Sequence, residues 1–270
     1  MVVKLGGEAI EAPAVLDSLL TDLVWLEQVG VSPILVHGGG KSINRAMEQA
    51  GLTPAFHQGR RITDAATMDI VAREVERLNT HIVDRIFALG GAAIGMCPPR
   101  HQVVHGKVYD AGLGLVGQPT SLDQERLARY ATRGLIPVVP PLSVDATGRA
   151  LNTNADDIAL AVATGMNAEK LVFCSSVPGV LTDPKDPSTR LSSLTAGEVR
   201  RLVADGTIKG GMIPKVESCI AALQAGVRKI HIVDAGMPHA LLLEIFTAEG
   251  IGTELRLGDD EAGSVASTAR

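Results

Sequence analysis

Short apolar runs alternate along the chain with longer stretches in which apolar residues recur every three or four positions. The first run, Val2–Leu5, predicts a buried strand, and the stretch at 14–29 predicts an amphipathic helix. Further runs predict strands at 33–37, 92–96, 136–139, 170–174 and 229–233. Helical spacing recurs at 41–50, 63–89, 122–133, 156–164, 195–205, 215–225 and 238–247. Such alternation is typical of right-handed strand–helix–strand units around a mainly parallel sheet.

The number of these units also suits a closed barrel of strands surrounded by helices, so alternation alone leaves the architecture open. Two features favour an open sheet. Short β-prone pieces separated by glycines at 101–119 predict hairpins outside the alternating core. Glycine clusters follow two of the strands, where open α/β sheets bind their ligands. We therefore expect an α/β fold: an open three-layer αβα sandwich with a mainly parallel central sheet and a β-hairpin insert.

Composition then narrows the class of protein. The 270 residues include 25 basic and 30 acidic side chains, and only 3% are aromatic. A net charge of −5 with so few aromatics excludes a broad basic surface or a row of stacking platforms, so no nucleic-acid partner is expected. No apolar run approaches the ~20 residues of a membrane helix, and the first residues lack a signal-peptide pattern. We expect no membrane partner.

The cysteines point to a compartment. Cys97, Cys174 and Cys219 are too widely spaced for a disulfide framework or a zinc motif. Such isolated cysteines are usual in reducing compartments. A cytoplasmic protein that binds a small molecule is therefore the expectation.

Three glycine clusters carry a lysine: KLGG at 4–7, HGGGK at 37–41 and KGGMIPK at 209–215. Successive glycines let backbone N–H groups approach an anion closely, and a helix N-terminus adds its dipole. A single cluster is most often a tight turn. The three together predict a polyphosphate site.

Two other glycine motifs resemble known nucleotide-binding motifs, but the residues around them do not fit. GKS at 40–42 resembles the end of a Walker loop, but Leu35 stands where the first glycine of that loop belongs. GLGLVG at 112–117 matches a dinucleotide fingerprint, yet it does not open a helix. We assign it to turns of the hairpin insert, which argues against a dinucleotide oxidoreductase.

Polar residues gather in two further motifs. LNTNADD at 151–157 contains two Asn and two Asp, which is more than one helix cap needs. The sequence favours neither capping nor ligand binding as the role of these residues. GRRITD at 59–64 is either a solvated surface or a bidentate clamp on a carboxylate. His37 ends a buried strand, so we expect a hydrogen-bonded structural residue. His101 and His105 lie in a strand–loop context, and metal ligation is not expected there.

In order and spacing, these segments resemble the amino acid kinase family, and within it the branch that phosphorylates N-acetyl-L-glutamate. The resemblance covers nearly the whole chain, and its most specific motifs are VVKLGGEAI, LVHGGGKSI, GRRITDAATMDIV, LNTNADDIALAVA and KGGMIPKVESCIAAL. It implies transfer of the γ-phosphoryl group of MgATP to the side-chain carboxylate of N-acetyl-L-glutamate. The product would be an acyl phosphate of arginine biosynthesis. ATP and Mg²⁺, the latter held through the phosphates, are the implied cofactors.

The resemblance also implies an organisation. Residues 1–160 would form an N-terminal lobe for the amino-acid substrate and for dimerisation, and residues 161–258 a C-terminal lobe for ATP. A homodimer would form through the long helix near 64–89. The acidic, then small and polar, residues at 259–270 predict a disordered tail.

Site roles carry over motif by motif. The implied catalytic residues are Lys4, Lys215 and Asp156. The lysines would flank the transferring phosphoryl group, and Asp156 would orient both lysines. The implied substrate-binding residues are Gly39, Gly40, Arg61 and Asn152. The implied nucleotide-binding residues are Gly6, Gly7, Lys209, Gly211 and Met212. No protein ligand to a metal is implied, and a carboxylate acceptor, already ionised at neutral pH, needs no general base.

Two positions depart from the family pattern. The residue before the Val-Pro-Gly turn is usually Asp and here is Ser176, and the usual GGNAM loop has Glu8 in place of Asn. Two other functions remain open. One is a carrier-linked aminoadipate kinase of lysine biosynthesis, against which the plain RRITD motif argues mildly. The other is a non-catalytic sensor of ATP or amino acid, which would have no need of Lys4, Lys215 and Asp156.

Overall fold

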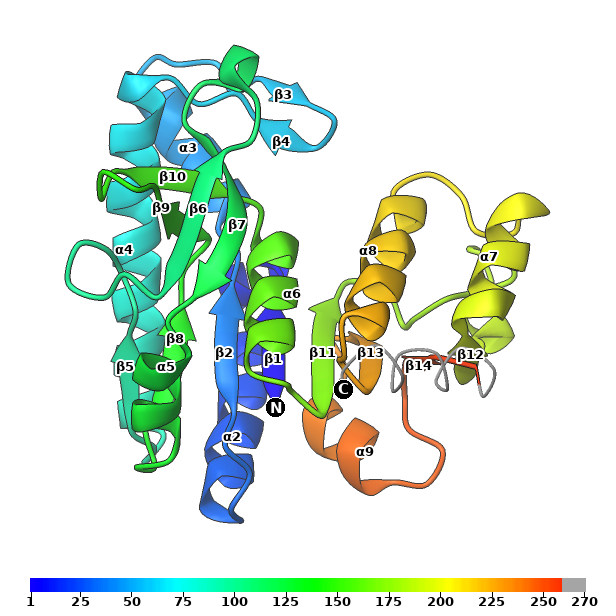
Figure 1. Ribbon diagram of the computed structural model, residues 1–270. Coiled ribbons are helices and arrows are strands. Elements are labelled where there is room, and N and C mark those ends of the chain that lie inside the picture. Colours follow the sequence, from blue (N-terminus) through cyan, green and yellow to red (C-terminus); the bar gives the residue numbers. More distant parts are fainter. Residues whose placement is uncertain (259–270) are drawn as a thin grey trace, which may run out of the picture.

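An eight-stranded sheet forms the centre of the computed structural model, which describes residues 1–258 (Figure 1). In spatial order its strands are β12 (Ser193–Thr195), β14 (Thr253–Arg256), β13 (Lys229–Asp234), β11 (Lys170–Ser175), β1 (Val2–Leu5), β2 (Ile34–His37), β8 (Ile136–Val139) and β5 (Ala93–Gly95). Every neighbouring pair is parallel except β13 and β14. The predicted mainly parallel sheet is confirmed.

Helices cover both faces of this sheet. Successive residues of a strand point to opposite faces, and accordingly Val2 and Val3 belong to two different apolar clusters. One face is covered by α2 (Pro13–Gln28), α4 (Ala65–Ala88) and α9 (Ala240–Phe246). The other is covered by α5 (Gln124–Ala131), α6 (Ala155–Gly165), α7 (Ala196–Ala204) and α8 (Met212–Gln224). The open three-layer sandwich is therefore also confirmed.

A small closed barrel stands beside the main sheet. Its strands, in order, are β10 (Ala150–Thr153), β7 (Val116–Leu122), β6 (Val104–Val108) and β9 (Leu142–Val144). The antiparallel pair β6–β7 is the predicted hairpin insert. The sequence motif at 112–117 lies between these strands and at the start of β7, so its assignment to hairpin turns is correct. The strands β9 and β10 were not predicted, because three or four residues are too few to show a period.

Helix α3 (Gly40–Gln49) and a two-stranded hairpin lie near the top of Figure 1. The helices α1 (Gly7–Glu11) and α3 begin in the glycine loops after β1 and β2. The hairpin consists of β3 (Phe56–His57) and β4 (Arg60–Arg61). Its turn residues Gln58 and Gly59 both have positive φ, at 48° and 76°, as a two-residue hairpin turn requires. Neither α1 nor the hairpin was predicted from the sequence.

Among the described helices, a side chain caps the N-terminus of α4, α5, α6 and α7. Asp64 caps α4 by accepting a hydrogen bond from Thr67 N at 2.8 Å. Helix α8 begins at Met212, ahead of the predicted start at residue 215. The predicted disordered tail at 259–270 lies outside the described residues. Within the described range, no helix combines the length and the apolar character needed to cross a membrane.

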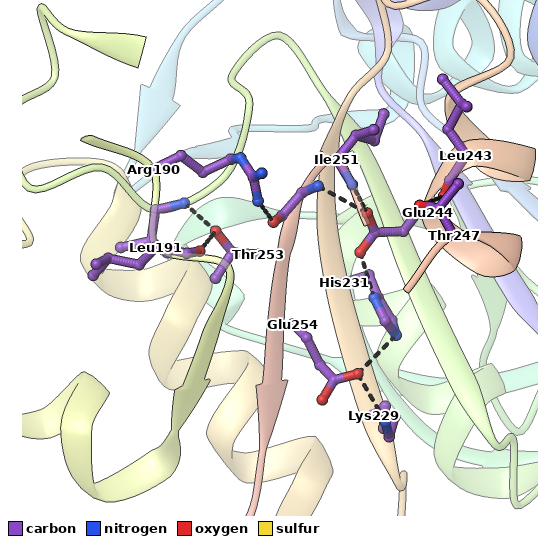
Figure 2. A network of polar contacts seen from close by, with 12 residues as sticks. Arg190, Leu191, Lys229, His231, Leu243, Glu244, Thr247, Ile251, Thr253 and Glu254 are labelled. Carbon is purple, nitrogen blue, oxygen red and sulfur yellow. Dashed lines mark hydrogen bonds and ion pairs between the residues drawn. The ribbon is translucent and has the colours of Figure 1, made fainter. Parts of the chain in front are cut away.

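A buried carboxylate holds the turn before β14, the antiparallel strand between β12 and β13 (Figure 2). Glu244, on α9, accepts hydrogen bonds from Ile251 N (2.6 Å), Gly252 N (2.8 Å) and His231 Nδ1 (2.6 Å). These bonds fix the turn that leads into β14. Burial alone would raise the pKa of Glu244, but the hydrogen bonds outweigh it and lower that pKa. The carboxylate therefore stays ionised and keeps its role as an acceptor.

Candidate functional site

Two glycine loops meet at the carboxyl ends of β1 and β2. Gly38 N donates a hydrogen bond to Leu5 O at 3.0 Å, which holds the second loop against the first strand. A side chain at Gly7 would place its Cβ 3.6 Å from Gly40 N and 3.9 Å from Gly39 N. With glycine at position 7 these amides are uncovered. Two of the predicted amide donors thus lie side by side, whereas Gly6 N donates to Cys174 O (3.3 Å).

The three predicted catalytic side chains lie together at this point. Lys4 Nζ, from β1, lies 2.7 Å from Asp156 Oδ1, in the first turn of α6. Lys215, in the first turn of α8, reaches the same place with its Nζ 5.3 Å from the centre of the Phe173 ring. Both lysine charges act on Asp156. A carboxylate between two ammonium groups can hold them in position by electrostatic attraction.

Burial and charge adjust the ionisation of this group. Burial lowers the pKa of Lys215, and the attraction of Asp156 only partly offsets this effect. Burial alone would raise the pKa of Asp156, but Lys4 and Lys215 reverse this and lower it. Asp156 is therefore a carboxylate at neutral pH. The net charge of the three side chains is positive while both lysines are protonated, which suits a site for phosphate.

Two cavities adjoin this group, and Lys4 lines both. The first, of about 240 Å³, is also lined by Gly39, Gly40, Arg61 and Asn152, the four predicted substrate-binding residues. The second, of about 280 Å³, is lined by Gly6 and Lys215. A ligand in either cavity can therefore approach the same ammonium group.

Arg61 brings an uncompensated positive charge to the first cavity. Its side chain is almost completely buried, and burial lowers its pKa without removing its charge, since an arginine titrates far above neutral pH. It donates hydrogen bonds to Asn44 Oδ1 (2.6 Å) and Gly40 O (3.2 Å), which are neutral acceptors. Among the described residues none of its hydrogen-bond partners is acidic. A carboxylate ligand would supply the missing charge.

The polar residues of the LNTNADD motif each make a different contact. Asn152 Nδ2 donates to Thr63 Oγ1 (2.9 Å), which fixes the amide at the first cavity. Asn154 caps α6 by accepting from Asp156 N (2.8 Å). Asp156 contacts Lys4, and Asp157 forms an ion pair with Arg60 at 2.7 Å. Capping therefore accounts for one of the four residues, and the others face the site or its walls.

The second cavity contains residues that the sequence analysis did not single out as ligands. Ser175 ends β11 and Ser176 follows it, while Asp234 ends β13 and Ala235 and Gly236 follow that strand. A usable signal existed for Asp234, because it is an acid directly after a buried apolar run, and carboxyl ends of parallel strands share one edge. The predicted nucleotide residues Lys209, Gly211 and Met212 lie at the start of α8, outside the lining of this cavity.

Glu8 does not project freely into the site. Its carboxylate lies 2.8 Å from Lys41 Nζ, and hydrogen bonds from Lys41 and Ser176 lower its pKa. The two positions that depart from the family pattern, 8 and 176, therefore contact each other. Both members of the Glu8–Lys41 pair are more than half exposed, so the pair contributes little to stability.

His37 has the structural role expected of it. The ring is fully buried, its Nδ1 donates to Gly38 O (2.8 Å), and Asn79 Nδ2 donates to its Nε2 (3.0 Å). Burial lowers its pKa to about 4. A neutral ring with both nitrogens occupied has no proton to exchange with a ligand, and it holds the second glycine loop in place.

Several known proteins resemble this chain in sequence. A model of the amino acid kinase family matches residues 1–234. The acetylglutamate kinase of Synechococcus elongatus is 43% identical over 255 residues, covering 94% of this chain and 85% of that protein. The acetylglutamate kinase of Methanosphaera stadtmanae is 40% identical, covering 95% of this chain and 91% of that protein.

A solved structure shares the fold. The N-acetylglutamate synthase from Neisseria gonorrhoeae, complexed with coenzyme A and N-acetyl-glutamate, superimposes with a TM-score of 0.84 at 24% identity. The match covers 95% of this chain and 59% of the synthase chain. The present chain thus spans well under two thirds of the synthase, and the likeness concerns the fold alone.

Proposed function

Because the chain belongs to the amino acid kinase family, we propose that it is an acetylglutamate kinase. It transfers the γ-phosphoryl group of MgATP to the side-chain carboxylate of N-acetyl-L-glutamate, in arginine biosynthesis. Relatives of that name at 40–43% identity over most of the chain support the reaction. The observation that carries the proposal is the position of Lys4, which lines both cavities and is paired with Asp156.

In this proposal the amino-acid substrate occupies the first cavity. Arg61, buried and without an acidic partner among the described residues, binds the α-carboxylate in the bidentate manner that a guanidinium allows. Asn152, held by Thr63, offers its amide to the same end of the substrate. The side-chain carboxylate then points toward Lys4 and the amides of Gly39 and Gly40. No general base is needed, because the attacking carboxylate is already ionised.

The nucleotide occupies the second cavity, with its phosphates directed toward Lys4 and Lys215. A carboxylate oxygen of the substrate attacks the γ-phosphorus, the bond to the β–γ bridging oxygen breaks, and ADP leaves with both bonding electrons. Charge spreads over the phosphoryl oxygens during this step, so positioning and electrostatic stabilisation dominate catalysis. The two ammonium groups supply that stabilisation from opposite sides. Asp156 keeps them apart and oriented.

Mg²⁺ bound with the nucleotide would neutralise part of the phosphate charge, beside the ammonium groups of Lys4 and Lys215. Mg²⁺ in such sites is bound mainly by phosphate oxygens and water, with one or two carboxylates. In this proposal the metal is held through the phosphates, and no side chain of the chain is assigned to it. In this proposal Lys209, Gly211 and Met212 contact the nucleotide from the start of α8.

We further propose a homodimer built through α4, and a cytoplasmic location. The long helix α4 carries Phe87 with 54% of its surface exposed, so this apolar ring is available for such a contact. In this proposal residues 1–160 bind the amino-acid substrate in the first cavity, and residues 161–258 bind ATP in the second. The three cysteines are free thiols, which suits a reducing compartment.

A coupled assay for ADP tests the reaction. Purified protein with MgATP should release ADP with N-acetyl-L-glutamate and far less with glutamate, aspartate or carbamate, and hydroxylamine should trap the acyl phosphate. Lys215→Ala should reduce turnover by at least about a hundredfold while the fold is retained, since it removes half of the cationic pair. Turnover only on a carrier-linked acid, or ATP binding without turnover on any acid, would instead favour the aminoadipate kinase or the sensor.

A further inference from the structure

A second arginine, next to Arg61 in the sequence, makes entirely different contacts. Arg60 Nη1 forms an ion pair with Asp157 Oδ2 at 2.7 Å, and its guanidinium lies 4.1 Å above the ring of Tyr109. The side chains of Arg60 and Asp157 are only 18% and 25% exposed. These contacts join β4, the first turn of α6 and the segment that follows β6.

The hairpin that carries Arg60 forms one wall of the first cavity. Phe56, Gly59, Arg60 and Arg61 all line that cavity. Each strand of the hairpin has two residues, and residues 56–59 are exposed. An isolated pair of such short strands has little stability of its own. The position of this wall therefore depends on side-chain contacts such as the one between Arg60 and Asp157.

The ion pair ends in the same helical turn as the catalytic pair. Asp156 contacts Lys4 and Asp157 contacts Arg60, so adjacent residues of α6 hold the reaction centre and the cavity wall. Asp157 also compensates the charge of Arg60. The charge of Arg61 remains available for a substrate, because its hydrogen bonds go to neutral acceptors.

We propose that Arg60 is a positioning residue: through Asp157 and Tyr109 it fixes the β3–β4 hairpin over the first cavity, so that Arg61 faces the bound substrate. Arg60 itself does not bind the substrate. The expected effect on the KM for N-acetyl-L-glutamate rests on the proposed function. The fixed position of the hairpin does not, because it is a property of the ligand-free protein. When the site is assembled in advance, the protein loses less conformational freedom on binding the substrate.

The test compares Arg60→Gln, Asp157→Asn and the double variant with the wild type. Each single variant should raise the KM for N-acetyl-L-glutamate roughly three- to tenfold, and the double variant should be no worse than either single, because both remove one interaction. The KM for MgATP and the midpoint of thermal unfolding should stay near their wild-type values. Arg60→Lys, which keeps the charge and loses the planar stack on Tyr109, should give an intermediate KM.

Arg228→Gln is the matched control, since Arg228 pairs with Glu169 at 3.3 Å at the opposite ends of the strands. It should leave both KM values unchanged. Hydrogen exchange provides a readout that does not need activity: without any substrate, the amides of residues 56–62 should exchange faster in Arg60→Gln than in the wild type.

The outcomes are separable. Additive effects in the double variant, an equal rise of both KM values, or unchanged hairpin exchange would each overturn the positioning role. If the wild type released no ADP with N-acetyl-L-glutamate, the proposed function would fail, whereas the exchange experiment would still decide whether Arg60 fixes the hairpin.

Discussion

At the scale of single residues, the environment of Lys215 decides how the site responds to pH. Its ammonium group is needed in the charged form, because a neutral amine cannot stabilise the phosphoryl oxygens. Burial lowers its pKa from the ordinary value of 10.5. The charged form is therefore lost as the pH rises through this lowered pKa, at a less alkaline pH than for a solvent-exposed lysine.

We accordingly expect kcat, measured with both substrates saturating between about pH 6 and pH 10, to decline on the alkaline side. The residual activity of Lys215→Arg should lack this decline, since a guanidinium remains protonated throughout that range. Lys229→Arg, at an exposed ion pair with Glu254, is the control and should retain the wild-type profile. If kcat of Lys215→Arg declined in the same way at alkaline pH, the decline would be due to a group other than Lys215.

Residue identity alone could not separate Arg60 from Arg61. Both lie in GRRITD with the same chemistry, and the resemblance to a known family was needed to choose Arg61 for the substrate. The structure distinguishes them by their partners, an acid for Arg60 and neutral acceptors for Arg61. Partners that lie 97 residues apart, such as Arg60 and Asp157, leave no local pattern in a sequence.

At the scale of elements, the loop after β1 makes a sharp prediction for Gly7→Ala. The added Cβ would lie at ordinary contact distance from Gly40 N, so the fold tolerates it, but the methyl group would cover amides proposed to face the phosphoryl group. We expect near-wild-type unfolding temperature and a fall in kcat/KM of roughly tenfold or more, about 1.4 kcal/mol in transition-state stabilisation.

Gly197→Ala provides the comparison for that variant. Gly197 lies within α7 with no atom near the position of an added Cβ, and alanine there should raise stability by about 0.5–1 kcal/mol. Its kinetic constants should not change. If Gly7→Ala retained full activity while folding normally, the uncovered amides would have no part in catalysis.

Elements were predictable in proportion to their length and burial. Central strands such as β1 and β11 are buried on both faces and appear as short apolar runs, and α4 shows a helical period over many turns. The barrel strands β9 and β10 and the β3–β4 hairpin are two to four residues long. Strands this short are stabilised by partners distant in sequence, which is information that local periodicity does not contain.

At the scale of the whole molecule, the proposed homodimer can be tested at Phe87. Light scattering during size-exclusion chromatography should give twice the mass of one chain for the wild type. Phe87→Asp should shift the protein toward a single chain, because it places a charge in the proposed apolar contact. Phe246→Asp, at an equally exposed ring on α9, is the control. A wild-type mass of one chain, or a dimer unaffected by Phe87→Asp alone, would contradict an interface through this part of α4.

The overall architecture was more predictable than the site walls. Alternation of strands and helices, with glycine clusters after two strands, correctly favoured an open sandwich over a barrel. It did not disclose that β9 and β10 close a small barrel with the hairpin insert. Nor did it show that Lys4 lines two cavities, since that depends on how α6 and α8 approach β1 from the other half of the chain.

The central place of β1 also has a consequence for synthesis on the ribosome. This first strand is bordered by β2 on one edge and by β11 on the other, so Val3 lies between Leu35 and Val172. Its second edge has no native partner until residues 170–175 have been made. An apolar edge left open for so long invites wrong pairing with other nascent chains. β1 therefore completes its hydrogen bonds only when β11 has been made, after β2, β5 and β8 of the same sheet, and its open edge can pair wrongly until then.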